Sequence, residues 1–319
     1  MTGFDGTIPV ARARTLVGDL RQLASVRRNG LDDGPERGLA ALAFSTGGGL
    51  DFWVLLDRAM DIGPLWHQGR PVAWQSPAGF RHPALVNIEG DGGFGFGRGF
   101  SGFLMTCGLD HTRWPMDGHP QHGRLSYLPA RLTACGEDWS TDAPHLYCEG
   151  EITQWRHHAE ALRLIRRIEA PIGGRTLRIR DRVENFGRER QRHALLYHIN
   201  IGFPAIAPGA TVCLGEDTVF GPLAEPDDQG APRSLSYPAG AAGGHCSLRQ
   251  GSNTVLTLDF STDSLPHLQL WHNPRPQGFV LALEPCTSPR PPDGTLAEEP
   301  VLAAGAQVAY ALDMTFGEI

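Results

Sequence analysis

The fold class is decided by residues 177–184, Leu-Arg-Ile-Arg-Asp-Arg-Val-Glu, which follow a Gly-Gly turn. Leu177, Ile179 and Val183 alternate with charged residues, and this two-residue period is typical of a strand with one buried face and one solvated face. Antiparallel sheets can leave one face in water, whereas parallel sheets are usually covered on both faces. We therefore expect an antiparallel strand at these residues.

Segments of strand length continue on both sides of this stretch, and amphipathic helices of three turns are nearly absent. Two of them, 39–43 and 52–56, are separated by Ser-Thr-Gly-Gly-Gly at 45–49, which predicts a hairpin. Residues 204–245 are rich in Pro and Gly, and we expect a long excursion or paired minor strands there. The remaining predicted strands are 125–134, 145–155, 161–170, 193–201, 255–260, 267–271, 279–284 and 308–314.

This spacing predicts an all-β protein, a large antiparallel β-sandwich. Sandwiches of this size are often single units, so we expect one domain over residues 1–319 of the 319-residue chain, with 1–38 as an N-terminal extension or edge elements.

Composition excludes several classes of function. The net charge of −7 gives no basic field for a phosphate backbone, so we expect no nucleic-acid partner. All 28 basic residues are Arg, which excludes lysine Schiff bases and a P-loop lysine. The N-terminal segment Met-Thr-Gly-Phe-Asp-Gly has no signal-peptide character, and no apolar run approaches 18 residues. We expect a cytoplasmic protein without membrane association.

The most glycine-rich stretch, 91–102, contains Gly-Arg-Gly-Phe-Ser-Gly, which matches the dinucleotide-binding pattern G-x-G-x-x-G. That pattern binds a pyrophosphate only between a parallel strand and a helix, and no strand run precedes it here. A mobile Gly/aromatic loop over a pocket is the interpretation we favour, and a plain connector is the alternative.

One carboxylate stands in an unusual place. Glu284 ends a run of five apolar residues and Pro285 follows it, so we expect a buried strand that stops at the rim of a cavity. His122 and His198 also lie in strand or rim contexts. A buried imidazole near a buried carboxylate forms an acid/base pair, although single histidines of this kind are more often satisfied core residues. A Glu base (pKa ~4.3) and a His acid (pKa ~6.5) can coexist near neutral pH.

A metal site is the alternative use of these groups. His111, His122, His198 and Glu284 carry suitable nitrogen and oxygen ligands, but the sequence has neither H-E-x-x-H nor H-x-H spacing. Gly-x-Ser-x-Gly is also absent, so no serine nucleophile is indicated. We expect no bound metal and no cofactor.

Three segments, in order, resemble the galactose mutarotase (aldose 1-epimerase) superfamily, in particular its uncharacterised branch with a His-Gly-Arg-Leu/Ile-Ser motif. Residues 121–126, Gln-His-Gly-Arg-Leu-Ser, resemble the His-Gly segment of that family. Residues 197–200, Tyr-His-Ile-Asn, resemble the strand that bears its catalytic His, and residues 283–289, Leu-Glu-Pro-Cys-Thr-Ser-Pro, resemble the segment that bears its base. The likeness spans about 39–314 and implies the supersandwich fold of that family.

The resemblance implies a mutarotase that interconverts the anomers of a free sugar or sugar acid. Glu284 would be the base and His198 the acid, and His122 would orient the ring oxygen or share the acid role. The sequence departs from the family at Tyr197, which replaces Asn, at Cys286, which replaces Gln, and at Arg290, which replaces Asp. The residues implied as catalytic are thus kept, whereas those that contact the sugar differ.

Other side chains are candidates for binding a small-molecule carbohydrate. Trp271 would stack on the sugar, and Arg124 would suit an anionic substituent such as a carboxylate or sulfonate. Arg58 and Asp61 form either a surface ion pair or a sugar contact. The full set of substrate-binding candidates is Arg58, Arg98, Asp110, His111, Arg124, Trp271, His272 and Asn273. A homo-oligomer is possible. A metal-dependent sugar isomerase or epimerase and a non-catalytic carbohydrate-binding module remain the alternative functions.

Overall fold

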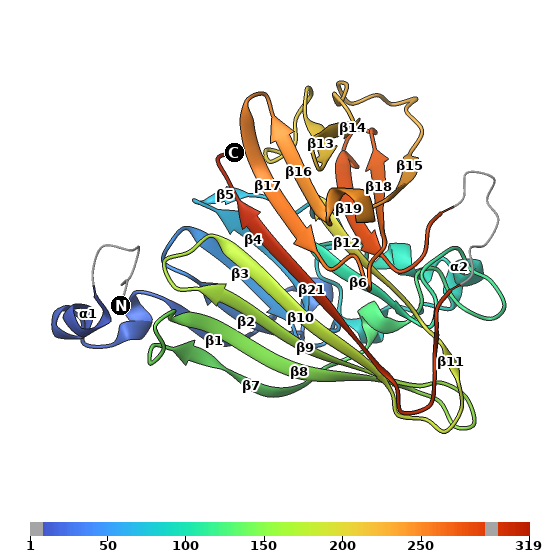
Figure 1. The fold of residues 1–319 in the computed structure, drawn as a ribbon, viewed down its shortest axis with the longest axis horizontal. Coiled ribbons are helices and arrows are strands. Elements are labelled where there is room, and N and C mark those ends of the chain that lie inside the picture. Colours follow the sequence, from blue (N-terminus) through green and yellow to red (C-terminus); the bar gives the residue numbers. More distant parts are fainter. Residues whose placement is uncertain (1–8, 291–298) are drawn as a thin grey trace.

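Two large β-sheets lie face to face in the computed structural model, which describes residues 9–290 and 299–319 (Figure 1). Within these residues one sheet has ten strands, in the order β1-β2-β3-β4-β6-β12-β19-β18-β15, with β5 paired to β4. The other has nine, in the order β14-β13-β16-β17-β21-β10-β9-β8-β7. Every ladder between these strands is antiparallel. The prediction of a large antiparallel β-sandwich is confirmed, whereas the N-terminal segment 1–6 lies outside the described residues.

The ten-stranded sheet consists of β1 (Ser25–Gly30), β2 (Ala40–Ser45), β3 (Leu50–Leu55), β4 (Asp61–His67), β5 (Arg70–Pro71), β6 (Leu104–Leu109), β12 (Ala194–Ile201), β15 (Arg233–Pro238), β18 (His267–Asn273) and β19 (Val280–Cys286). The nine-stranded sheet consists of β7 (Arg131–Asp138), β8 (His145–Trp155), β9 (Ala161–Pro171), β10 (Thr176–Asn185), β13 (Thr211–Leu214), β14 (Asp217–Phe220), β16 (His245–Gln250), β17 (Asn253–Phe260) and β21 (Gln307–Phe316). A small ribbon pairs β11 (Gln191–Arg192) with β20 (Val301–Leu302).

Helices are short and lie outside the sheets. The α-helices of the described residues are α1 (Val10–Leu16) and α2 (Gly90–Gly93), and the 3₁₀ turns are η1 (Leu20–Gln22), η2 (Gly34–Glu36), η3 (Pro83–Leu85), η4 (Gly95–Arg98), η5 (Leu125–Tyr127) and η6 (Gly240–Ala242). No helix within residues 9–290 and 299–319 is both long and apolar enough to cross a membrane.

The periodic segments fold as predicted. Residues 177–184 lie inside β10, where Leu177, Ile179 and Val183 are fully buried. The hairpin of β2 and β3 forms around the Gly-rich turn, and minor strands β13, β14 and β15 occupy 204–245.

Several predicted strand ends differ from the structure, and a proline is involved in two of them. The strand predicted over 125–134 is instead the turn η5, and β7 begins only at Arg131, after Pro129, which has no N–H to offer a ladder. The strand predicted to stop at Glu284 continues through Pro285 to Cys286, because a proline removes only its own donor and the following residues still pair with β12 and β18.

The core between the sheets contains a charged cluster as well as apolar side chains. Arg166 of β9 donates from Nη2 to Asp181 of β10 at 2.7 Å and from Nη1 to Asp61 of β4 at 3.3 Å. Tyr197 of β12 donates to Asp181 at 2.8 Å, and Thr106 of β6 donates to Asp61 at 2.6 Å. These bonds join the two sheets across the core. Arg58 and Asp61 are each 1% exposed, so they do not form a surface ion pair, which was one of the two interpretations of these residues.

Candidate active site

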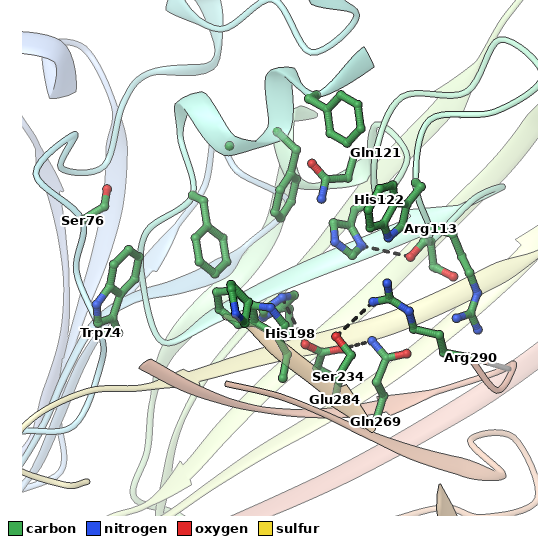
Figure 2. A pocket seen from close by; sticks show the side chains of 18 residues that line it. Trp74, Ser76, Arg113, Gln121, His122, His198, Ser234, Gln269, Glu284 and Arg290 are labelled. Carbon is green, nitrogen blue, oxygen red and sulfur yellow. Dashed lines mark hydrogen bonds and ion pairs between the residues drawn. The ribbon is translucent and has the colours of Figure 1, made fainter. Parts of the chain in front are cut away.

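A cavity of about 480 Å³ opens on the ten-stranded sheet, over strands β12, β18 and β19. Aromatic rings form much of its wall, and Glu284 and His198 lie between Ser76 on one side and Arg113 and Arg290 on the other (Figure 2). The aromatic lining residues are Trp74, Phe94, Phe96, Phe100, Trp114 and Trp271. Such a cavity suits a ligand with flat apolar patches and several hydroxyl groups, because aromatic faces stack on the patches while a few polar groups fix its orientation.

Strand register brings three polar residues into one row on the cavity floor. Gln269 of β18 lies directly opposite Glu284 of β19. On the other side of β19, Leu196 pairs with Cys286 and Ile199 with Leu283, and this register sets His198 opposite Glu284. Side chains of a strand alternate between faces, so these three face the cavity while their neighbours enter the core.

The carboxyl group of Glu284 is the centre of this row. Its Oε1 lies 3.2 Å from Nε2 of His198, and its Oε2 accepts a hydrogen bond from the amide of Gln269. The side chain is almost fully buried. Burial raises the pKa of Glu284 to about 8, although the hydrogen bond from Gln269 and the charges of Arg290 and Arg113 act in the opposite direction. Glu284 therefore retains a proton well above the pH at which a solvated glutamate loses one.

His198 is held in a defined tautomer. Asn200 donates from Nδ2 to the carbonyl of Gly102 at 3.0 Å, so its Oδ1 is the acceptor for Nδ1–H of His198, at 2.6 Å. Nε2 is left facing Glu284. Burial lowers the pKa of His198 to about 4, against a smaller opposing effect of Asn200. Between about pH 4 and about pH 8 the Glu284–His198 pair thus holds one titratable proton beyond the one fixed on Nδ1.

His122 lies against the same pair. Its ring centroid is 5.7 Å from that of His198, and Nδ1 donates to the carbonyl of Thr112 at 2.9 Å. Burial, with a further contribution from His198, lowers the pKa of His122 to about 3. In the neutral ring Nε2 is consequently a hydrogen-bond acceptor, and it can accept a hydrogen bond from a hydroxyl group of a ligand.

Several lining residues were missed from sequence. Gln269 lies two residues from Trp271 on a predicted strand, and the strand period alone places both on one face. Arg290 directly follows the 283–289 segment and was noted only as a departure from the family. Arg113 precedes Trp114 in a loop without any periodic signal.

The cavity lining contains Glu284, His198, His122 and Trp271 among the residues expected from sequence, but not the other substrate-binding candidates that the structure describes. Arg124 donates to Glu89 at 2.7 Å, and Asp110 lies 3.0 Å from His119. His111 bonds to the carbonyl of Trp114 at 2.7 Å. These three residues hold the loop that forms one wall of the cavity.

The remaining candidates have other surroundings. Arg58 is buried beneath the glycine-rich loop and donates to the carbonyl of Gly99 at 2.7 Å. Arg98 is 63% exposed and pairs with Asp91. His272 lies on the opposite face of β18 from Trp271, because the two are sequence neighbours on a strand, and Asn273 caps the next turn through a bond from Arg275 at 3.2 Å.

The glycine-rich segment 91–102 forms the end of α2, then η4 and the turn after it, and its Phe96 and Phe100 line the cavity. Within the described residues no helix follows it in the manner of a dinucleotide-binding motif. Its position at the cavity agrees with the interpretation as a Gly/aromatic loop over a pocket. Over residues 9–290 and 299–319, no group of three or more His, Cys, Asp or Glu side chains is arranged to hold a metal ion.

The two facing antiparallel sheets define the galactose mutarotase-like β-sandwich. A "putative aldose 1-epimerase" from Klebsiella pneumoniae shares this fold with a TM-score of 0.82 at 20% identity, covering 95% of this chain and 85% of that one. A galactose mutarotase-like protein from Clostridium acetobutylicum (TM-score 0.64, 11% identity, 92% and 98% covered) and a galactose 1-epimerase from Lactobacillus acidophilus (0.56, 12%, 91% and 98%) share it too.

Within this class the chain belongs to the DUF4432 family, a domain of unknown function, whose profile matches residues 36–239, more than half of the chain. No curated protein matches the sequence.

Proposed function

We propose that this protein is a sugar mutarotase, which interconverts the anomers of a free sugar or sugar acid. The observation that carries the proposal is the Glu284–His198 pair, whose carboxyl and imidazole atoms lie 3.2 Å apart on the floor of an aromatic-walled cavity. The fold shared with solved structures named a putative aldose 1-epimerase and a galactose 1-epimerase supports it.

Mutarotation requires two proton transfers at oxygens attached to one carbon. A base removes the proton of the O1 hydroxyl, the C1–O5 bond breaks with its electron pair passing to the ring oxygen, and an acid protonates that oxygen. The carbonyl at C1 then rotates, and the ring closes on its other face. Because O1 and O5 share C1, the acid and the base must lie within a few ångströms of each other, as Glu284 and His198 do.

A pair that shares one proton can complete the whole cycle. Ring opening uses carboxylate Glu284 as base and protonated His198 as acid, and it leaves a protonated Glu284 and a neutral His198. Ring closure uses that second state and restores the first. The guanidinium groups of Arg290 and Arg113 favour the carboxylate form, since they lower the pKa of Glu284, while burial favours the carboxylic acid. The opposing effects keep both one-proton states accessible.

The surrounding residues position the sugar in this proposal. Trp271 and Phe100 offer ring faces for stacking, and their centroids lie 5.7 Å and 5.1 Å from that of His198. Nε2 of His122 accepts a hydrogen bond from a sugar hydroxyl. The chemistry needs no metal and no cofactor.

Exchange NMR of the α and β anomers over a panel of aldoses, ketoses and uronates tests the proposal. Glu284→Gln and His198→Asn should each lower the enzyme-catalysed exchange rate about 10²- to 10⁴-fold, the usual contribution of a positioned acid or base. Glu189→Gln and His245→Asn, at exposed positions, are the matched controls. Undiminished exchange in both active-site variants would contradict the assignment. Sugar binding by the wild-type protein without any exchange would instead favour a carbohydrate-binding module.

A further inference from the structure

Two arginines line the same cavity as the acid/base pair. Arg290 follows β19 and donates from Nη1 to Ser234 Oγ at 3.0 Å, while its backbone N–H donates to Ser236 Oγ at 3.3 Å. Its guanidinium carbon lies 5.7 Å from the ring centroid of Trp114. The side chain is therefore held on the cavity wall by β15 on one side and an aromatic ring on the other.

Arg113 supports this arrangement from behind. Its Nη2 donates to the carbonyl of Ser288 at 2.7 Å and to that of Pro289, the two residues before Arg290. Arg113 thus fixes the backbone from which Arg290 projects, and burial lowers its own pKa. We assign the ligand contact to Arg290 and a positioning role to Arg113.

The charges of the cavity do not balance. The charged side chains among its described lining residues are Arg113, Arg290 and Glu284. Arginine stays protonated in proteins, whereas burial keeps Glu284 largely neutral below about pH 8. No ion pair within 4 Å joins either arginine to a carboxylate of residues 9–290 or 299–319. Among the residues that the structure describes, the cavity lining is consequently positive, and hydroxyl groups alone do not compensate a guanidinium charge.

Arg290 lies on the side of the cavity away from Trp74 and Ser76 (Figure 2). Figure 2 shows Glu284 and His198 between Trp74 and Ser76 on one side and Arg290 and Arg113 on the other. A sugar whose anomeric carbon lies over the pair can extend a distant substituent toward Arg290.

We infer that the substrate is an anionic sugar, with a carboxylate, sulfonate or phosphate substituent that pairs with the Arg290 guanidinium. The reaction, anomer exchange, rests on the proposed mutarotase function. The binding of an anionic sugar at Arg290 does not depend on it. The guanidinium fork bonds two oxygens of such a group at once, which an ammonium cannot do.

Matched pairs of sugars test this inference. Binding by calorimetry and anomer exchange by NMR are measured for glucose and galactose, and for glucuronate, galacturonate, 6-deoxy-6-sulfoglucose and glucose 6-phosphate. At least one anion should have a kcat/KM about 10- to 100-fold above that of its neutral parent, since hydrogen bonds to charged groups contribute that much. Comparison of the carboxylate, sulfonate and phosphate arms then identifies the substituent.

Variants at the wall complete the test. Arg290→Gln should remove most of the advantage of the anion, mainly through KM, so that kcat/KM falls more for the anion than for its neutral parent. Ser234→Ala should act in the same direction but more weakly, and Arg156→Gln, an exposed arginine, should have no effect. A thermal unfolding curve for each variant shows that it is folded.

Three outcomes decide between the ideas. Equal activity on neutral and anionic sugars, or an equal loss on both in Arg290→Gln, overturns the inference and leaves the mutarotase proposal intact. Absence of binding for every anion at millimolar concentration also overturns it. Binding of an anion that Arg290→Gln abolishes, without anomer exchange in the wild-type protein, supports the ligand class and contradicts the mutarotase proposal.

Discussion

Nδ1 of His198 donates a 2.6 Å hydrogen bond to Oδ1 of Asn200, two residues along the same strand. Both side chains project from the cavity face of β12, because strand residues two apart share a face. The bond orients the imidazole so that Nε2 meets Glu284 at 3.2 Å. The amide of Asn200 therefore decides which imidazole nitrogen faces Glu284, and so which one would transfer the proton in the proposed reaction.

Asn200→Asp should raise the pKa of His198 from about 4, because a carboxylate beside Nδ1–H stabilises the imidazolium. The acidic limb of the pH–rate profile should then move to higher pH, with a smaller effect on the alkaline limb. The measurement is the exchange rate from pH 3.5 to 9. Asn253→Asp, at an exposed position of β17, is the control and should leave both limbs in place. An unmoved acidic limb would show that Asn200 does not control the titration of His198.

The wild-type pH–rate profile should have a plateau between about pH 4 and about pH 8. Below about pH 4 His198 takes a second proton and the pair has no base. Above about pH 8 Glu284 loses the shared proton and the pair has no acid. The two limbs report macroscopic values of the coupled pair and not of either residue alone. A rate that keeps rising through pH 9, after subtraction of the spontaneous reaction, would contradict a one-proton pair.

The free energy of unfolding of Glu284→Gln, relative to that of the wild type, should increase as pH rises from about 4.5 to about 8. The folded pKa of about 8 lies above the ordinary value of 4.5, so between these values the native protein holds a proton that the unfolded chain has released. Wild-type stability is thus present below about pH 4.5 and declines as pH rises to about 8, by at most about 1.4 kcal/mol per pH unit. Glutamine does not titrate. Urea unfolding at pH 5, 6.5 and 8 measures the difference, and a difference independent of pH would contradict the raised pKa.

Arg166→Met should lower the free energy of unfolding by about 3 to 5 kcal/mol, because it leaves the carboxylates of Asp61 and Asp181 buried without their cation. Arg163→Met lies on the same strand but points to the surface, where its ion pairs with Glu151 and Glu184 are partly solvated, so the expected loss is below about 1 kcal/mol. Chemical denaturation measures both. Equal losses in the two variants would show that the buried cluster contributes no more than a surface pair.

Local patterns predicted the strands whose faces differ in polarity. β8 was predicted with its observed bounds because turn residues flank it, and β10 was predicted within two residues because its apolar and charged residues alternate. Within residues 177–184 the alternation is broken only at Asp181, a charge on the core face that Arg166 compensates from the neighbouring strand. The sequence around Asp181 does not predict that Arg166 is its partner, because Arg166 lies on another strand.

The site was predictable only in part for the same reason. Glu284 and His198 each looked unusual within an apolar run, and the resemblance to mutarotases gave them roles. That Gln269 contacts Glu284, or that Arg290 reaches Ser234, depends on the register and order of β15, β18 and β19, which are set by the whole sheet. Arg124 was given the anion-binding role from sequence, but its guanidinium contacts Glu89 and Gly118, so the structure favours Arg290 for that role.

Glu284 and His198 belong to the interiors of two hydrogen-bonded strands, whereas Arg290, Trp114 and Phe94 belong to the segments that connect strands. Connecting segments accept substitutions, insertions and deletions far more readily than paired strands do. Substitutions in these loops can therefore change which ligand the cavity accepts, while the Glu284–His198 pair keeps its geometry on the paired strands.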